Sequence, residues 1–261
     1  MKLVTWITAL SLLVGAGVAL AQQSQAGSSP PATSAVSVKE PAAMALLKRM
    51  CDRLQAAKTF TVKGRISLEL PVAGGDLATF YTDVEMSVRR PDGLAAGRRA
   101  GDLPELRFVY DGKKMTVYEP GTGKWGTTSA PATLDAMLPA AGEQGDINLP
   151  FDEFVVADPY AAITKGLTDA VQVGATTIQG KKVEHLVLSS AVLRLEYWID
   201  TATALPMRSL VVYLDHPLQP HFSMEFSEWK VDSKLSDATF ALPKPKGATE
   251  VDFRDAAGAY R

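Results

Sequence analysis

The chain has 261 residues, of which 46% are hydrophobic and 21% are charged, so it is long enough to bury one core of ordinary size. Its formal charge of −2 excludes the strong positive field that nucleic-acid-binding proteins usually carry. Its single cysteine, Cys51, excludes an intramolecular disulfide. We therefore expect one globular domain that is stabilised by its hydrophobic core and does not bind nucleic acid.

The first 21 residues have the pattern of a secretory signal peptide. Lys2 precedes an apolar run from Leu3 to Leu20, and Ala19-Leu20-Ala21 supplies small residues before a cleavage site. An uncleaved anchor is the alternative, but glycines and hydroxyl residues interrupt the run, which is short for a membrane span. Residues 22–39 are rich in Ser, Ala, Gln and Pro and predict a disordered leader. We expect an exported, soluble protein that is not membrane-anchored after cleavage.

Residues 41–57 predict an amphipathic helix at the start of the folded domain. Apolar residues recur there every three or four positions, with a proline in the first turn. Cys51 lies on the apolar face of this helix with Leu47, Met50 and Leu54. We therefore expect Cys51 to be a buried and inert thiol rather than a reactive one.

Alternation of apolar and polar residues predicts a series of antiparallel strands after this helix. The first two are expected at 60–70 and 80–89, and Asp111-Gly112 predicts a hairpin because glycine adopts the positive φ that a tight turn needs. Further strands are expected at 123–128, 171–173, 183–188, 193–199, 207–214 and 222–231, the last with a bulge where the alternation changes phase. Roughly nine to eleven strands in one sheet should make it curl strongly or close.

An apolar insertion at residues 131–163 separates two groups of strands. One short helix is expected at 134–138, and short helices are expected at 149–163, where Pro150 and Pro159 are breaks and plausible hinges. Phe151, Phe154 and Tyr160 must be buried somewhere. We predict that they pack into the open side of the sheet and form a lid.

Three patterns suggest chemistry, but each fits its context poorly. Gly121–Gly126 matches the glycine spacing of dinucleotide sites, yet it joins two predicted strands rather than a strand and a helix. Ser227–Lys230 matches the S-x-x-K motif but lies within a predicted strand. His185, His216 and His221 lack the spacing of a metal site. We expect no enzymatic activity, no cofactor and no metal.

The acidic residues of the strands alternate with apolar ones. A solvated outer face accounts for this pattern, and a catalytic pair of carboxylates on that face is the alternative. The residues concerned are Asp83, Glu85, Glu184, Glu196, Glu225 and Glu228.

Several short motifs recur in a fixed order from Ala42 to Ala248. They are Tyr110-Asp111-Gly112-Lys113, Pro150-Phe151, Asp158-Pro159-Tyr160, Val173-Gly174, Gly180, His185-Leu186, Tyr197-Trp198-Ile199, Pro206, Trp229, Phe240-Ala241-Leu242-Pro243 and Gly247-Ala248. With these motifs the chain resembles an uncharacterised family of predicted periplasmic proteins, a domain of unknown function grouped with the LolA/LolB-like lipoprotein carriers. No lipid-attachment cysteine is present, unlike in the membrane-anchored carriers.

The resemblance implies a mainly β (α+β) fold. It implies a strongly curved antiparallel sheet that forms an incomplete barrel, with helices packed on its concave side. Such a LolA-like half-barrel domain would span residues 40–253 and leave a C-terminal tail at 254–261. It also implies a periplasmic location, and we expect a monomer. The family has no established activity and supplies no catalytic residues.

The leading hypothesis is a soluble periplasmic binding protein or carrier for a hydrophobic ligand, such as a lipid or a lipoprotein acyl chain. The expected ligand-binding residues are Phe80, Val84, Met86, Phe108, Tyr110, Met115 and Val117, with Phe151, Phe154 and Tyr160 as the lid. Ordinary core packing is the alternative for each of them. The second hypothesis is a non-enzymatic interaction or sensor module in envelope signalling or assembly, with an envelope protein as its partner.

Overall fold

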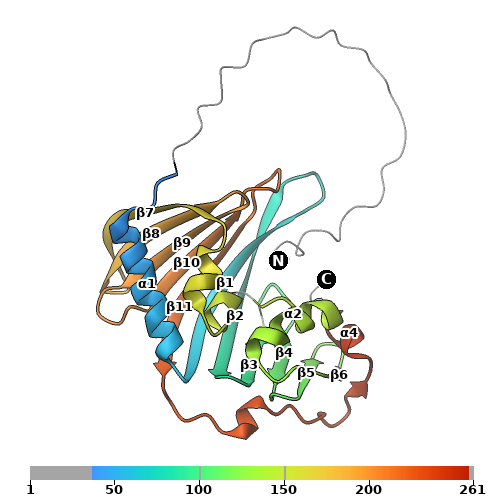
Figure 1. Cartoon of the computed structure of the whole chain (residues 1–261). Helices are drawn as coiled ribbons and strands as arrows, with labels where there is room; N and C mark the ends of the chain where they lie inside the picture. The colour runs from blue at the N-terminus through green and yellow to red at the C-terminus, as the bar shows by residue number, and fades with distance from the viewer. Residues whose placement is uncertain (1–36, 100, 150, 259–261) are drawn as a thin grey trace, which may run out of the picture. The chain divides into compact units, whose positions relative to one another are not determined.

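One sheet organises the part of the chain that the computed structural model describes, residues 37–99, 101–149 and 151–258 (Figure 1). Its 12 strands lie in the order β12-β6-β5-β4-β3-β2-β1-β11-β10-β9-β8-β7. Neighbouring strands are antiparallel except β12 and β6, which are parallel. The predicted mainly β fold is confirmed. The predicted signal peptide, most of the predicted leader and Pro150 lie outside the described residues.

The elements have the following bounds. The strands are β1 (Thr59–Pro71), β2 (Leu77–Arg89), β3 (Gly93–Arg98), β4 (Leu106–Tyr110), β5 (Lys114–Glu119), β6 (Lys124–Ser129), β7 (Leu167–Ile178), β8 (Lys181–Ser190), β9 (Leu193–Asp200), β10 (Pro206–Tyr213), β11 (His221–Val231) and β12 (Thr249–Glu250). The helices are α1 (Pro41–Ala56), α2 (Leu134–Gly145), α3 (Pro159–Thr164) and α4 (Phe253–Ala256), with single 3₁₀ turns η1 (Asp152–Phe154) and η2 (Asp237–Phe240).

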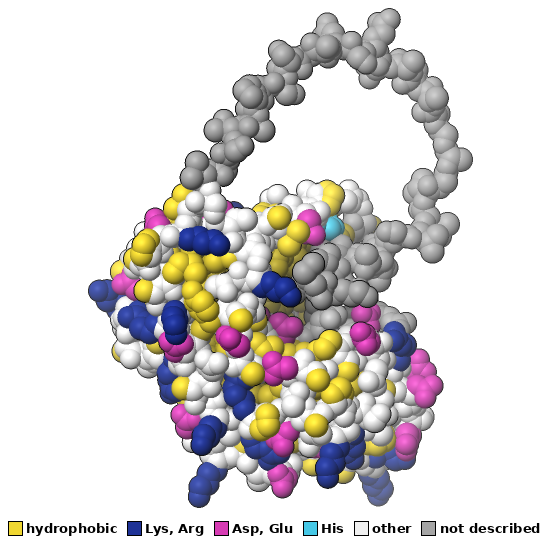
Figure 2. All heavy atoms as spheres, in the orientation of Figure 1, with side chains coloured by type: hydrophobic (Ala, Val, Ile, Leu, Met, Phe, Trp, Pro, Cys, Tyr) yellow, Lys and Arg dark blue, Asp and Glu magenta, His cyan; other side chains and the backbone are white. Residues whose placement is uncertain are grey.

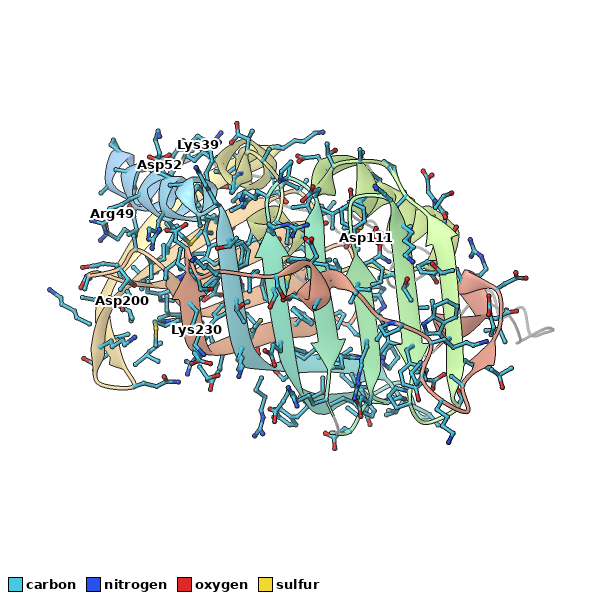
Figure 3. All side chains as sticks on the ribbon, turned by 90° about the horizontal axis from the view of Figure 1, so that it is seen from below. Lys39, Arg49, Asp52, Asp111, Asp200 and Lys230 are labelled. Atoms are coloured by element: carbon cyan, nitrogen blue, oxygen red, sulfur yellow. The ribbon has the colours of Figure 1, made fainter. Side chains whose placement is uncertain are left out.

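The helices form two groups on the concave face of the sheet. One group, α1, α3 and η1, packs together and contacts β7 and β8, while α2 and α4 contact each other and α4 covers β5 and β6 (Figure 1). Figure 3 shows α1 and α2 near opposite ends of the sheet and on the same side of it. The buried side chains of both groups belong to one continuous hydrophobic core.

Local sequence signals place several elements correctly. Leu47, Met50, Cys51 and Leu54 are all buried on the apolar face of α1, as predicted. The predicted hairpin joins β4 and β5, with Gly112 at φ +84°. The predicted bulge in β11 is also confirmed, because Lys63 pairs with Glu228 while Gly64 pairs with Phe226, which leaves one extra residue on β11.

Other elements are longer than the sequence predicted. β7 spans 12 residues rather than 171–173, because Gly174 and two register shifts hide its alternation. α2 continues past Pro139 to Gly145, whereas a loop was expected after residue 138. A Cβ on Gly145 would lie 2.5 Å from a ring atom of Phe253, so the glycine that suggested a loop is required by helix packing.

The ends of the domain also differ from expectation. Lys39, assigned to the disordered leader, forms a parallel bridge with Ala170 at the edge of the sheet. Ala256 and Ala257, assigned to the C-terminal tail, are at most 1% exposed. The folded domain therefore extends beyond residues 40–253 in both directions.

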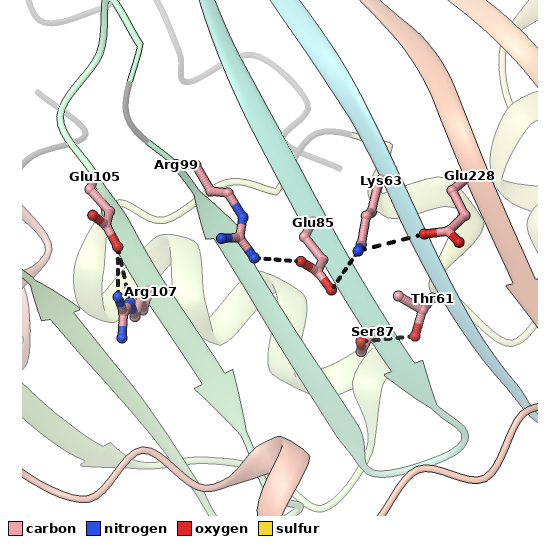
Figure 4. A network of polar contacts seen from close by, with 8 residues as sticks. All are labelled: Thr61, Lys63, Glu85, Ser87, Arg99, Glu105, Arg107 and Glu228. Carbon is pink, nitrogen blue, oxygen red and sulfur yellow. Dashed lines mark hydrogen bonds and ion pairs between the residues drawn. The ribbon is translucent and has the colours of Figure 1, made fainter.

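The convex face carries exposed ion pairs, as predicted for the outer face of the sheet. Figure 4 shows Glu85 between Arg99 (2.9 Å) and Lys63 (4.0 Å), which also pairs with Glu228 (3.5 Å). Glu184 is an exception, because its register partner is the core residue Ile199. It therefore lies on the concave side, where Gln172 Nε2 donates to it (2.9 Å).

Candidate functional site

A row of apolar side chains crosses the concave face and is only partly covered. Its members are successive register partners on five neighbouring strands, Phe80 (β2), Leu68 (β1), Phe222 (β11), Val211 (β10) and Leu195 (β9). All five are half-buried, whereas the surrounding core is buried. Figure 2 shows hydrophobic side chains along a hollow between the lobe of α1 and the lobe of α2. We call these five residues the apolar row.

The predicted ligand-binding residues divide into two sets. Phe80, Val84 and Met86 lie on the concave face of β2 and are half-buried, so a ligand in the hollow could reach them. The other strand residues, Phe108, Tyr110, Met115 and Val117, are at most 1% exposed.

The second set lies under the helices rather than along the hollow. A Cβ on Gly126, the register partner of Val117, would lie 2.9 Å from atoms of both Ala256 and Phe253, so α4 packs directly on this part of the sheet. The Tyr110 hydroxyl donates to the carbonyl of Pro131 (2.6 Å). These four residues are core, and their assignment as ligand-binding residues is corrected accordingly.

Within the predicted lid, Phe151 and Phe154 pack onto the sheet as predicted, and we call the shorter segment 151–157 that contains them the lid. Phe151 stacks on Phe154 with ring centroids 5.5 Å apart and contacts the ring of Phe222 at 5.4 Å. Phe154 is fully buried, and its ring centroid lies 6.0 Å from that of Tyr197. Tyr160 is half-buried on α3, which packs beside α1. Phe151 therefore covers the apolar row at Phe222, and Phe154 packs beside the row on Tyr197.

One partly buried arginine holds the C-terminal half of the lid in place. Arg90 donates to the carbonyls of Phe154 (2.7 Å), Val155 and Val156 (2.6 Å) and to that of Ala57 at the end of α1 (3.2 Å). Its planar guanidinium thus satisfies carbonyl groups from two segments. A hinge at Pro159 was predicted. The hydrogen bonds from Arg90 hold residues 154–156, just before this proline, and therefore oppose a hinge motion there.

A pair of acidic side chains lies at the inner surface of the lid. The Tyr197 hydroxyl donates to Glu153 Oε1 (2.8 Å), and the carboxyl group of Asp152 on the same turn acts on Glu153 through its charge. Burial, together with the charge of Asp152, raises the pKa of Glu153 to about 7. Burial and the same two carboxyl groups raise the pKa of Tyr213 to about 12. We call Asp152, Glu153, Tyr197 and Tyr213 the acidic recess.

Sequence reasoning missed the acidic recess. The available signal was a pair of adjacent acids inside an apolar insertion, between Phe151 and Phe154. Such a pair reads as solvent-exposed in a sequence, because isolated acids are rarely buried. Register then brings Tyr197 and Tyr213 to the same face of the sheet, through pairing of β9 and β10.

The other side chains that could take part in chemistry lie outside the acidic recess or are buried. The pair His185 and Glu196 (2.9 Å) lies on the opposite, convex face, where His185 stacks on Trp198. Cys51 is buried as predicted, and burial raises the pKa of its thiol to about 12.

Two general site types were also tested against the structure. Among the described residues, no three His, Cys, Asp or Glu side chains are grouped so that they could hold a metal ion. Within the same residues, no helix is both long and apolar enough to cross a membrane.

The sequence was compared with known families and with curated proteins. A family model described as predicted periplasmic protein (DUF2092) matches residues 43–254. The chain belongs to this family. The predicted family and its periplasmic location are thereby confirmed. No curated protein matches the chain.

Several solved structures are similar to the chain at low sequence identity. An uncharacterised conserved protein from Thermus thermophilus is 15% identical, with 81% of this chain and 99% of that chain covered and a TM-score of 0.45. The lipoprotein LppX of Mycobacterium tuberculosis is 12% identical, with coverages of 76% and 99% and a TM-score of 0.47. In the Pseudomonas aeruginosa MucA/MucB complex, the matched chain is 13% identical, with coverages of 77% and 61% and a TM-score of 0.43.

Proposed function

We propose that this protein is a non-enzymatic periplasmic binding protein or carrier for a hydrophobic ligand such as a lipid acyl chain. The apolar row is the observation that carries the proposal. Five neighbouring strands present apolar side chains to a hollow and leave them half-buried between two helical groups. A continuous apolar surface in a concave place is typical of ligand grooves.

The free energy gained by burying the lid rings is comparable in size to that gained by burying an acyl chain. Burying the rings of Phe151 and Phe154 contributes about 1.5–3 kcal/mol each to the closed form. An acyl chain gains about 0.8 kcal/mol for each methylene that it buries. A chain that displaces one lid ring can therefore offset its loss with a few methylenes, and binding is reversible.

The test compares two adjacent residues on opposite faces of β2. Phe80 lies in the apolar row, whereas Tyr81 is on the convex face and 51% exposed. We expect Phe80→Glu to weaken binding of N-phenyl-1-naphthylamine, a neutral fluorescent probe, by about tenfold or more. Tyr81→Glu should leave the affinity unchanged, and circular dichroism should show that both variants are folded.

Two results would contradict the carrier proposal. The first is that the native protein does not bind the probe and carries no lipid in native mass spectrometry after purification from the periplasm. The second is an equal loss of affinity in Phe80→Glu and Tyr81→Glu, which would show that the probe does not lie along the apolar row.

An interaction module in the envelope is the second candidate, because two neighbouring hairpin tips expose hydrophobic side chains. Leu70 (39% exposed) and Val72 (40%) lie in or beside the turn after β1, and Leu218 (42%) lies between β10 and β11. The backbone of His221 donates to Glu69 (2.8 Å), which brings the two tips together. Photo-crosslinking from position 72 in the periplasm tests this candidate. If the protein is an interaction module, crosslinking should give one adduct with a partner protein. Leu218→Ser should abolish this adduct and leave the affinity for N-phenyl-1-naphthylamine unchanged.

A further inference from the structure

The acidic recess adjoins one end of the apolar row. Leu195 of the row and Tyr197 of the recess are two residues apart on β9, so their side chains lie on the same face. Tyr213 is two residues beyond Val211 on β10 and lies on the same face, but on the other side of the row, because it pairs with Leu193. A chain lying along the row would therefore reach the polar groups of the recess at its β9–β10 end.

A second polar group, independent of the acids, lies in the floor between these strands. Ser209 is the register partner of Tyr197 on the concave face and is 1% exposed. Its hydroxyl has no hydrogen-bond partner among the described residues. A buried hydroxyl without a partner costs stability, so its presence requires an explanation such as a ligand group or a bound water.

The groups that face Glu153 are acidic or neutral. They are Asp152 on the same turn, Tyr197 on β9, Tyr213 on β10 and Cys51 on α1, whose thiol pKa is raised by burial and by the charge of Glu153.

Two arginines could neutralise the acidic recess by their position: Arg90 lies next to the lid, and Arg98 lies on the concave face of the sheet. Arg90 is bonded to Phe154, Val155 and Val156, so its donors are already occupied. Arg98 is on the concave face of β3, separated from β11 by β2 and β1. The recess is therefore a place where a cation is stabilised and a carboxylate is repelled.

We propose that the acidic recess binds the headgroup of the hydrophobic ligand, and that this headgroup carries a primary ammonium group rather than a carboxylate. The proposal rests on the proposed function, since it names the ligand class of the same groove. An ammonium group offers three hydrogen-bond donors and a positive charge, and the carboxyl groups of Asp152 and Glu153 offer acceptors and negative charge. The unpartnered hydroxyl of Ser209, on the strand beside Tyr197, is a further acceptor in this region.

The proposal fixes the sign of a pH dependence. The pKa of Glu153 is raised to about 7, so this side chain is mostly neutral in mildly acidic solution. An ammonium group binds the ionised form more tightly, and its affinity should rise as the pH increases through 7. A neutral headgroup should show little change, and a carboxylate should bind more weakly as the pH rises.

The experiment uses three ligands with the same dodecyl chain length and different headgroups. Dodecylamine, monolauroylglycerol and dodecanoate compete with N-phenyl-1-naphthylamine for the full chain at pH 8 and at pH 5.5. We expect dodecylamine to bind about tenfold more tightly than dodecanoate at pH 8, with a smaller difference at pH 5.5. Equal or tighter binding of dodecanoate at pH 8 would overturn the proposal.

Three variants test whether the preference for dodecylamine arises in the acidic recess. Glu153→Gln should weaken dodecylamine binding about tenfold and leave monolauroylglycerol binding unchanged. Tyr197→Phe is the second variant; it frees Glu153 from its hydrogen bond and should retain the preference for dodecylamine. Glu225→Gln on the convex face is the matched control and should change nothing.

The outcomes separate the two proposals. If no ligand and no probe binds, the proposed function and the headgroup assignment both fail. If all three ligands bind equally, or if Glu153→Gln weakens all three alike, the carrier function stands and the headgroup assignment is overturned.

Discussion

The two halves of the sheet have similar alternating sequences, but different segments pack on their concave faces. In the half formed by β4, β5 and β6, small residues let α4 approach closely, as at Gly126 and Ala256, and the strand side chains beneath are at most 1% exposed at Phe108 and Val117. In the half formed by β9, β10 and β11, the cover near the hollow is the lid, and Leu195, Val211 and Phe222 stay half-buried. An apolar strand face becomes core or groove according to what packs on it.

The two halves also differ in the polarity of the side chains that their covering segments enclose. The helix-covered half encloses hydrophobic side chains such as Leu134, Met137 and Phe253, together with Tyr110, whose hydroxyl is satisfied by a carbonyl. The lid-covered half encloses Asp152 and Glu153, whose carboxyl groups resist ionisation there. Both side chains are half-buried. Removing acids from water is costly for stability, which is why such groups are more often found at functional sites than in a core.

The largest expected effect is on the free energy of unfolding when one phenylalanine in each half of the sheet is replaced by alanine. Phe108→Ala should lower the free energy of unfolding by about 3–5 kcal/mol, because it opens a cavity in closely packed core. Phe80→Ala should lower it by about 1 kcal/mol, since the side chain is only half-buried. Urea unfolding measures both changes. Equal losses would show that both residues are core, and the contrast between the halves would disappear.

The next effect concerns the anchoring of the lid. Arg90→Met keeps the aliphatic volume but leaves the carbonyls of Phe154, Val155 and Val156 without their donor, and we expect a loss of about 3 kcal/mol. Hydrogen exchange should quicken in the lid before it quickens in β4 and β5. Arg208→Met on the convex face is the control, and a similar exchange pattern in that variant would contradict the anchoring role.

A smaller effect is expected in the pH dependence of stability. Since the pKa of Glu153 is raised to about 7 in the folded state, the folded protein holds this proton more tightly than the unfolded chain does. The free energy of unfolding should therefore fall by about 3 kcal/mol as the pH rises from about 4 to 7, and level off above that. Thermal unfolding across this range should show a flatter profile for Glu153→Gln than for Glu225→Gln. An identical slope in both variants would mean that Glu153 is not the titrating group.

The smallest effect is expected on the convex face. Arg65 Nε donates to Asp83 (2.7 Å), and this hydrogen bond holds the pKa of Asp83 below its usual value, yet both side chains are largely exposed. Solvent screening makes such pairs weak, so Asp83→Asn should leave the urea midpoint and the probe affinity unchanged. A clear loss of probe affinity would show that the convex face takes part in binding.

Particular residues show how far local patterns reach. Gly112 and the phase change in β11 locate a hairpin and a bulge because both are set by residues close in sequence. The prediction ended α2 at residue 138, before a glycine-containing segment, but Gly145 belongs to the helix because it packs against Phe253, more than 100 residues later in the chain. Phe80 and Phe108 look alike in their strands, and α4, which covers one of these halves, comes from the far end of the chain.

The sequence by itself determined the curved antiparallel sheet, the amphipathic helix α1 with its buried cysteine, and the inward packing of Phe151 and Phe154. These follow from periodicity and hydrophobicity, which act between neighbouring residues and need no knowledge of distant partners. Only the tertiary structure decided which apolar residues line the hollow and that Glu153 meets Tyr197. Those contacts join segments far apart in the chain, and their burial and pKa values depend on everything packed around them.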